Sequence, residues 1–171
     1  MIGNKWVKKG ITGEALGKPV SPFPSWLTKI FGTGLGTGYA PVAQGTAGSL
    51  LFVILWWFFV PDEPFVQAAI LLIVTWVSIP LSAWGERMWG EDPGRITVDE
   101  FAGQAVALFM VPHVWYYFVA SFILFRIFDS FKLPFIRKNI ETLPGGYGVT
   151  LDDTVAGLLA RCCMVPILLI L

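Results

Sequence analysis

Five acidic residues at the ends of otherwise apolar segments are the side chains of this sequence best suited to chemistry: Asp99, Glu100, Asp129, Asp152 and Asp153. Acids near a bilayer are costly and need partners, and Arg126 and Lys132 are the nearest cations in sequence. If the acids converge in the fold, they repel one another unless something positive lies between them. Carboxylate oxygens are the ligands of Mg²⁺, Mn²⁺ and Ca²⁺. The pattern therefore predicts a hard-metal site, with all five acids as ligands, at one face of a membrane protein.

Helix capping is the structural alternative for two of these acids. Thr97 and Glu100, like Thr150 and Asp153, have the spacing of a capping box. Acids in a first helical turn also suit the helix dipole. Capping does not account for the acid that precedes each of them, nor for Asp129, which is expected near the end of its helix. We therefore favour the metal site, and capping is compatible with it.

Arg126 allows two interpretations. It lies three residues before Asp129, so the two side chains are expected to share one helix face. They can form a simple ion pair within the helix. Alternatively, Arg126 faces the acids and binds an anionic substrate, to which its forked donors are suited.

A glycine-rich stretch at residues 32–38 and 44–49 leads into an apolar run. Backbone amides at such a helix start favour phosphate. Glycines are also typical of flexible turns and of close helix packing, so this signal alone is weak. No Lys follows the last glycine, which excludes a Walker-type loop.

Composition predicts a membrane protein. Hydrophobic residues make up 55% of the chain and charged residues 14%, and the mean hydropathy is +0.66. Eight Trp and fourteen Phe agree with a position at membrane–water boundaries. The net charge is zero, so nucleic-acid binding has no electrostatic basis. We expect one domain over residues 1–171, folded as an all-α polytopic membrane helical bundle. The sequence leaves the oligomeric state open.

Five apolar runs are candidate membrane helices: 45–60, 65–84, 98–111, 114–131 and 152–171. Two are shorter than the usual ~20 residues, so the number of full spans stays open. The loops between them alternate between bearing and lacking Lys or Arg, which predicts a cytoplasmic N-terminus and all five acids at the cytoplasmic face. Residues 1–30 are expected to be a cytoplasmic or interfacial segment, with an amphipathic stretch at 22–31 on the membrane surface.

Two segments echo each other along the chain. Residues 97–103 and 150–157 each have a Thr followed by two acids and then an Ala-Gly pair. Small residues let membrane helices approach closely. We therefore expect these two helices to place their acid pairs side by side.

Several segments form a recognisable series along the chain: 45–50 (GTAGSL), 99–103 (DEFAG), 125–129 (FRIFD) with Lys132 and 134–137 (PFIR), and 145–148 (GGYG) leading to 152–157 (DDTVAG). Taken together and in this order, they resemble the phosphatidylglycerophosphatase A family of bacterial inner-membrane lipid phosphatases. Members often have a Pro before the Gly-Thr, where this chain has Gln44, so the local loop shape is expected to differ more than the chemistry.

The resemblance implies Mg²⁺-dependent hydrolysis of the terminal phosphate of phosphatidylglycerol phosphate, giving phosphatidylglycerol in phospholipid biosynthesis. Metal-assisted attack by water is the favoured mechanism, and a covalent route through an Asp or Thr46 stays open, as does the number of metal ions. The expected catalytic residues are Asp99, Glu100, Arg126, Asp129 and Asp153, and the expected phosphate ligands are Gly45, Thr46, Arg126 and Lys132.

Two other classes fit part of the pattern. A small cation transporter would use the acids as an ion pathway, but it needs them at the membrane midplane rather than at helix ends. A CDP-alcohol-type phosphatidyltransferase also uses clustered Asp residues and Mg²⁺, but it needs a nucleotide site, and no separate one is apparent.

Overall fold

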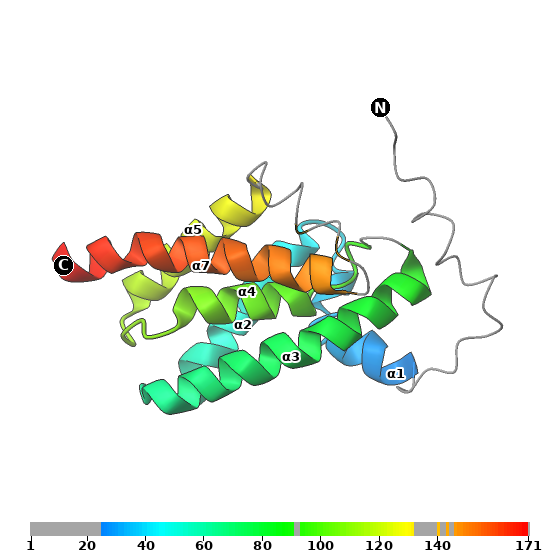
Figure 1. Cartoon of the computed structure of the whole chain (residues 1–171), viewed down its shortest axis with the longest axis horizontal. Coiled ribbons are helices and arrows are strands. Elements are labelled where there is room, and N and C mark those ends of the chain that lie inside the picture. Colours follow the sequence, from blue (N-terminus) through cyan, green and yellow to red (C-terminus); the bar gives the residue numbers. More distant parts are fainter. Residues whose placement is uncertain (1–24, 91–92, 132–139, 141–142, 144–145, 171) are drawn as a thin grey trace.

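The computed structural model describes residues 25–170, except 91–92, 132–139, 141–142 and 144–145. The described residues form helices and connecting turns, with no strand among them, which confirms the all-α prediction. Figure 1 shows the long helices lying side by side along the length of the molecule. These are α2 (Gln44–Phe59), α3 (Pro64–Trp89), α4 (Val98–Leu108), α5 (Trp115–Ser130) and α7 (Tyr147–Ile170).

The apolar runs become the helices, as hydrophobicity predicts, but two boundaries differ from expectation by five residues, and α4 ends three residues early, at Leu108. Helix α3 continues through Pro80 and ends at Trp89. The next residue, Gly90, has a φ of 101°, a backbone conformation that glycine adopts readily and other residues rarely. Helix α7 begins at Tyr147, five residues before the expected start at 152. Asp152 and Asp153 therefore lie in the second turn of α7 rather than at its start.

Helix α4 is the centre of the bundle and is buried along nearly its whole length. It packs against α2, α3, α5 and α7. Its closest neighbour is α7, because a Cβ atom added to Gly157 would lie 2.1 Å from the Gly103 carbonyl oxygen. No residue larger than glycine fits there without a shift of the backbone. The predicted close approach through small residues is thus confirmed, and it brings the acidic turns of the two helices together.

The first described residues form a short helical segment, α1 (Ser25–Leu27) followed by the π-helical turn η1 (Thr28–Gly32). Thr28 and Gly32 are buried against the rest of the protein, whereas Trp26, Ile30 and Phe31 are exposed. Large apolar side chains therefore face outward from this segment, together with Lys29. Residues 22–24 of the predicted amphipathic stretch lie outside the described residues, and contact with a membrane surface stays a prediction.

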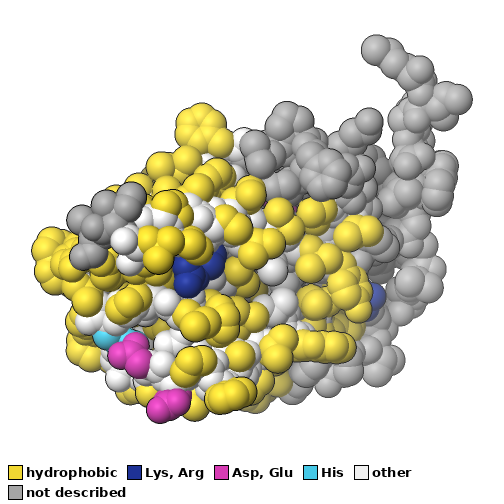
Figure 2. All heavy atoms as spheres, turned by 60° about the vertical axis from the view of Figure 1, so that its left-hand side comes forward, with side chains coloured by type: hydrophobic (Ala, Val, Ile, Leu, Met, Phe, Trp, Pro, Cys, Tyr) yellow, Lys and Arg dark blue, Asp and Glu magenta, His cyan; other side chains and the backbone are white. Residues whose placement is uncertain are grey.

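Large apolar side chains cover much of the outside. Phe59, Phe65 and Trp76 are 77%, 89% and 72% exposed. On the face drawn in Figure 2, hydrophobic side chains dominate, and acidic and His side chains gather near one end. Within the described part of the chain, α3 is the helix whose length and composition suffice to cross a membrane, and α2 is a shorter apolar helix.

Candidate metal and phosphate site

Three of the five predicted acids converge from three helices. Glu100 of α4, Asp129 of α5 and Asp153 of α7 each offer one carboxylate oxygen, and these oxygens lie within 4.8 Å of one another. Glu100 and Asp153 are buried, and Asp129 is partly buried. Oxygen ligands alone are the donor set of hard divalent cations. This carboxylate triad can therefore hold a divalent metal ion.

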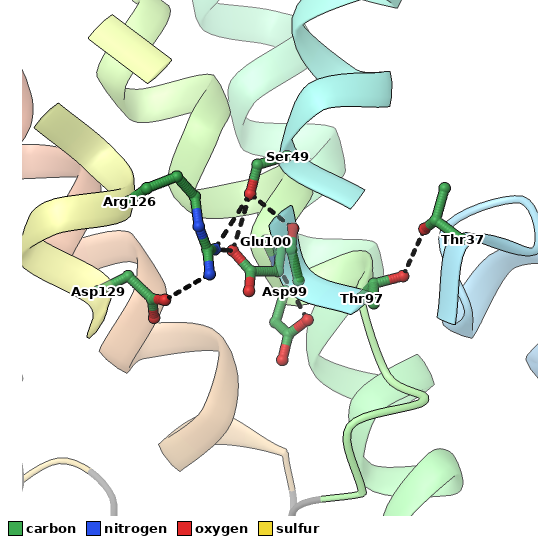
Figure 3. A network of polar contacts seen from close by, with 8 residues as sticks. Thr37, Ser49, Thr97, Asp99, Glu100, Arg126 and Asp129 are labelled. Carbon is green, nitrogen blue, oxygen red and sulfur yellow. Dashed lines mark hydrogen bonds and ion pairs between the residues drawn. The ribbon is translucent and has the colours of Figure 1, made fainter. Parts of the chain in front are cut away.

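Arg126 lies between two members of the triad (Figure 3). Its Nη2 is 3.1 Å from Asp129 Oδ2, and its Nη1 forms an ion pair with Glu100. The ion pair within the helix is therefore confirmed, and Arg126 also faces the acids. Its binding of an anionic substrate stays a prediction. A single guanidinium carries one positive charge against three carboxylates. Burial and mutual repulsion disfavour such a cluster unless further positive charge compensates it.

Asp99 and Asp152 are buried near the triad but do not belong to it. Asp99 Oδ1 accepts a hydrogen bond of 2.9 Å from the Glu100 backbone N–H at the start of α4. Asp152 lies beside Asp153 in α7. The structure thus brings together three of the five predicted ligands, and a ligand role for these two acids stays a prediction.

The capping alternative is wrong for both Glu100 and Asp153. Thr97 precedes α4, but its side chain makes no capping bond, and its backbone N–H donates to the Gly32 carbonyl instead. The Thr97 hydroxyl is 2.9 Å from that of Thr37. Thr150 lies inside α7, where a cap has no function. Neither acid therefore forms a capping box, although Glu100 does lie in the first turn of α4, where its charge suits the helix dipole.

The glycine-rich stretch reaches the triad through the first turn of α2. A Cβ atom on Gly45 would lie 2.0 Å from Glu100 Oε1 and 3.3 Å from Arg126 Nη2, so the absence of a side chain permits this contact. Thr46 is partly buried in the same turn. Lys132 lies outside the described residues. Phosphate binding by these residues stays a prediction, but Gly45 is placed where that prediction requires.

Ser49 is a site residue that the sequence analysis missed. Its Oγ is 3.0 Å from Glu100 Oε2 and accepts a hydrogen bond of 3.2 Å from Arg126 Nη1. Ser49 follows Gly45 by four residues, so the two share a face of α2. That spacing within the glycine-rich motif is the signal that could have identified it.

The fold and the site define a class: a helical protein in which a carboxylate triad able to hold a metal ion lies beside an arginine and a helix N-terminus. This combination is suited to phosphate chemistry. Comparison with known proteins gives the family. The family model described as Phosphatidylglycerophosphatase A matches residues 30–168. The chain belongs to the phosphatidylglycerophosphatase A family, as its sequence motifs suggested.

Curated relatives agree. The chain is 32% identical to phosphatidylglycerophosphatase A of Escherichia coli over 134 residues, which cover 77% of each chain. It is 35% identical to phosphatidylglycerophosphatase A of Haemophilus influenzae over 138 residues, covering 77% of this chain and 82% of the relative. It is also 43% identical over 142 residues to a putative phosphatidylinositol-3-phosphatase of Bacteroides thetaiotaomicron, covering 78% and 89%. No solved structure matches the chain significantly.

Proposed function

We propose that this protein hydrolyses the terminal phosphate of phosphatidylglycerol phosphate to give phosphatidylglycerol, with Mg²⁺ as the metal, as a step of phospholipid biosynthesis. The observation that carries this proposal is the triad of Glu100, Asp129 and Asp153 beside Arg126. Family membership supports it, because two curated relatives carry the name phosphatidylglycerophosphatase A.

The triad would hold the metal, with Asp99 and Asp152 as additional candidates. A divalent cation bound there would polarise the phosphoryl oxygens and lower the pKa of a coordinated water. Arg126 now donates to Glu100 and Asp129, and its fork also matches a phosphoryl group. Once positive charge compensates the carboxylates, Arg126 can turn its donors to the substrate and stabilise charge that develops on the phosphoryl oxygens.

The start of α2 supplies a second set of donors. The first backbone N–H groups of a helix have no partner within it, and the positive end of the helix dipole lies there. Gly45 and Thr46 belong to this first turn, and Gly45 contacts the triad. We assign them, together with Arg126 and Lys132, to the binding of the substrate phosphate.

A multi-pass position in the bacterial inner membrane is part of the same proposal. Exposed apolar side chains on the helices and the length of α3 support it. Helix α4 has 11 residues, about 16 Å of helix, so it reaches only about half-way across a hydrocarbon core of ~30 Å. The triad lies where α4 begins, α5 ends and the early turns of α7 lie, which is one end of the bundle. We place this end, with the segment 1–30, at the cytoplasmic side.

Phosphatidylinositol 3-phosphate is a second candidate substrate, because the relative with 43% identity carries the name of its phosphatase. Both lipids present a phosphate monoester on a polyol headgroup. The same triad and arginine can serve either, so the choice depends on headgroup contacts.

Phosphate release by the purified protein in lipid nanodiscs tests the proposal. We expect release from phosphatidylglycerol phosphate that needs Mg²⁺, stops with chelator, and exceeds release from phosphatidylinositol 3-phosphate at least tenfold in kcat/KM. The reverse ratio would assign the second substrate. Release from neither lipid, or transfer to an alcohol only with CDP-activated lipid, would reject a phosphatase. Asp62→Asn is a matched control, because Asp62 is an exposed acid that contacts His113, away from the triad.

A further inference from the structure

Gln104 is a fully buried amide without a partner. Its side chain has no exposed surface, and neither its Nε2 nor its Oε1 has a hydrogen-bond partner among the residues that the structure describes. Buried polar groups are nearly always hydrogen-bonded, because leaving them unpaired costs free energy. An unpaired amide with both atoms buried therefore points to a ligand.

The position of Gln104 relates this amide to the triad. It follows Glu100 by four residues in α4, so the two side chains lie on one face, a single turn apart. Side chains of a helix lean towards its N-terminus, and the N-terminus of α4 is the end at the site. From this spacing we expect the amide of Gln104 to lie beneath the Glu100 carboxylate, on the side of the protein core.

A second buried glutamine shows what a structural role looks like in this fold. Gln67 of α3 is also almost fully buried, and both ends of its amide are paired. Its Nε2 donates to the Pro61 carbonyl at 3.0 Å, and its Oε1 accepts from the Met110 N–H at 2.8 Å. Gln67 thus ties two loops together. Gln104 makes no such contact with the described residues, so holding the bundle together does not explain it.

Water is the ligand that fits the position. A lipid phosphate cannot reach a side chain with no exposed surface, whereas a buried water commonly bridges polar groups that lack other partners. The Glu100 carboxylate has about four acceptor positions, and Ser49 and Arg126 both approach the same oxygen, Oε2. A water between the Gln104 amide and Glu100 would satisfy the amide and fix the carboxylate from below.

We propose that Gln104 is a positioning residue of the phosphatase site, which orients Glu100 towards the metal through ordered water. The expected effect of Gln104 on turnover rests on the proposed function. The expected effect of Gln104 on metal affinity depends only on metal binding by the triad. Groups that orient metal ligands in this way typically change metal affinity by about 10–100-fold when they are removed.

The test compares Gln104→Met with Gln67→Met. Both replacements keep the length of the side chain and remove the amide. Mg²⁺ affinity is measured as the midpoint of the Mg²⁺-dependent rise in melting temperature, without substrate. For Gln104→Met we expect an unchanged or higher melting temperature without metal, a Mg²⁺ midpoint raised at least tenfold, and a lower kcat with little change in KM. For Gln67→Met we expect a lower melting temperature and an unchanged midpoint.

Two results would overturn the proposal. One is a Mg²⁺ midpoint of Gln104→Met within twofold of the wild-type value, whatever its melting temperature. The other is an equal shift of the midpoint in Gln67→Met, which would show a general effect of core substitution. Gln104→Asn, which retains a shorter amide, should give an intermediate midpoint. Wild-type protein that binds Mg²⁺ but releases no phosphate would reject the proposed function and leave the midpoint test of Gln104 intact.

Discussion

Replacing Asp153 by Asn tests whether the carboxylate triad is a metal site. Asn keeps the size of the side chain and removes its charge. The triad oxygens lie within 4.8 Å of one another, so with an effective dielectric constant of about 20 each pair of charges repels by about 3.5 kcal/mol at that distance. The substitution removes two of these repulsions and also removes the attraction of Asp153 to Arg126. We therefore expect the metal-free variant to be at least as stable as the wild-type protein.

The response to Mg²⁺ should change in the opposite direction. At a concentration of about 100 Kd, a ligand that binds only the folded state stabilises it by about 2.7 kcal/mol. For a chain of this size, that corresponds to a rise in melting temperature of about 5–11 °C. A variant whose Kd is about 100-fold higher gains only about 0.4 kcal/mol at the same concentration, or about 1 °C.

The assay is a Mg²⁺ titration of the melting temperature for wild type, Asp153→Asn and the control Asp62→Asn, with phosphate release measured on the same samples. We expect the large response in wild type and control, and its loss together with activity in Asp153→Asn. The metal site would be refuted if the wild-type melting temperature did not change with Mg²⁺ and Asp153→Asn kept near-normal activity.

Three further predictions follow from the contacts of single residues. Arg126→Lys keeps the charge but loses the fork that reaches two carboxylates, so kcat should fall about 100-fold without loss of folding; a wild-type rate would reduce Arg126 to a structural ion pair. Gly157→Ala would place a Cβ 2.1 Å from the Gly103 carbonyl oxygen, so thermal unfolding should show a loss of about 1–3 kcal/mol, and an unchanged melting temperature would contradict the tight contact. Cysteines introduced at Asp62 and Lys138 should react with an impermeant reagent from opposite sides of the membrane, and labelling from the same side would overturn the proposed topology.

The helices and the convergence of the acids could be predicted from the sequence because each has a local signal. Apolar runs predict α2 and α5 to within one residue at each end, and they predict the starts of α3 and α4 equally well, since burial or contact with lipid acts on every residue of the run. The repeated order of a Thr, two acids and an Ala-Gly pair indicated that α4 and α7 lie side by side. The close approach of Gly103 and Gly157 confirms that interpretation.

The start of α7 could not be predicted, because a contact distant in sequence determines it. Gly145 to Gly148 is typical of a turn, and Gly146 does have a φ of 81°. A Cβ there would lie 2.3 Å from the Ile79 carbonyl oxygen of α3, so the chain is held against α3 and the helix begins directly afterwards, at Tyr147. The helix propensities of the residues around position 147 give no information about this contact with α3.

The polar contacts around the triad could not be predicted from the sequence either. Ser49 contacts Glu100 because α2 presents that face to α4. The same packing decides that Arg126 reaches Glu100 as well as Asp129. Contacts of this kind depend on the relative rotation of two helices, for which hydrophobic patterns give only a coarse estimate. The membrane topology and the roles of Asp99, Asp152 and Lys132 stay predictions.

The order in which the ribosome makes these elements has a consequence for biosynthesis. The site draws Ser49, Glu100, Asp129 and Asp153 from α2, α4, α5 and α7, so its last carboxylate emerges after the other three residues. Before α7 packs against α4, Gly103 has no Gly157 to contact, and only two of the three carboxylates of the triad are present. We therefore expect a nascent or truncated chain that lacks α7 to be inactive. Hydrolysis would begin only when α7 has packed against α4 and brought Asp153 to the other two carboxylates.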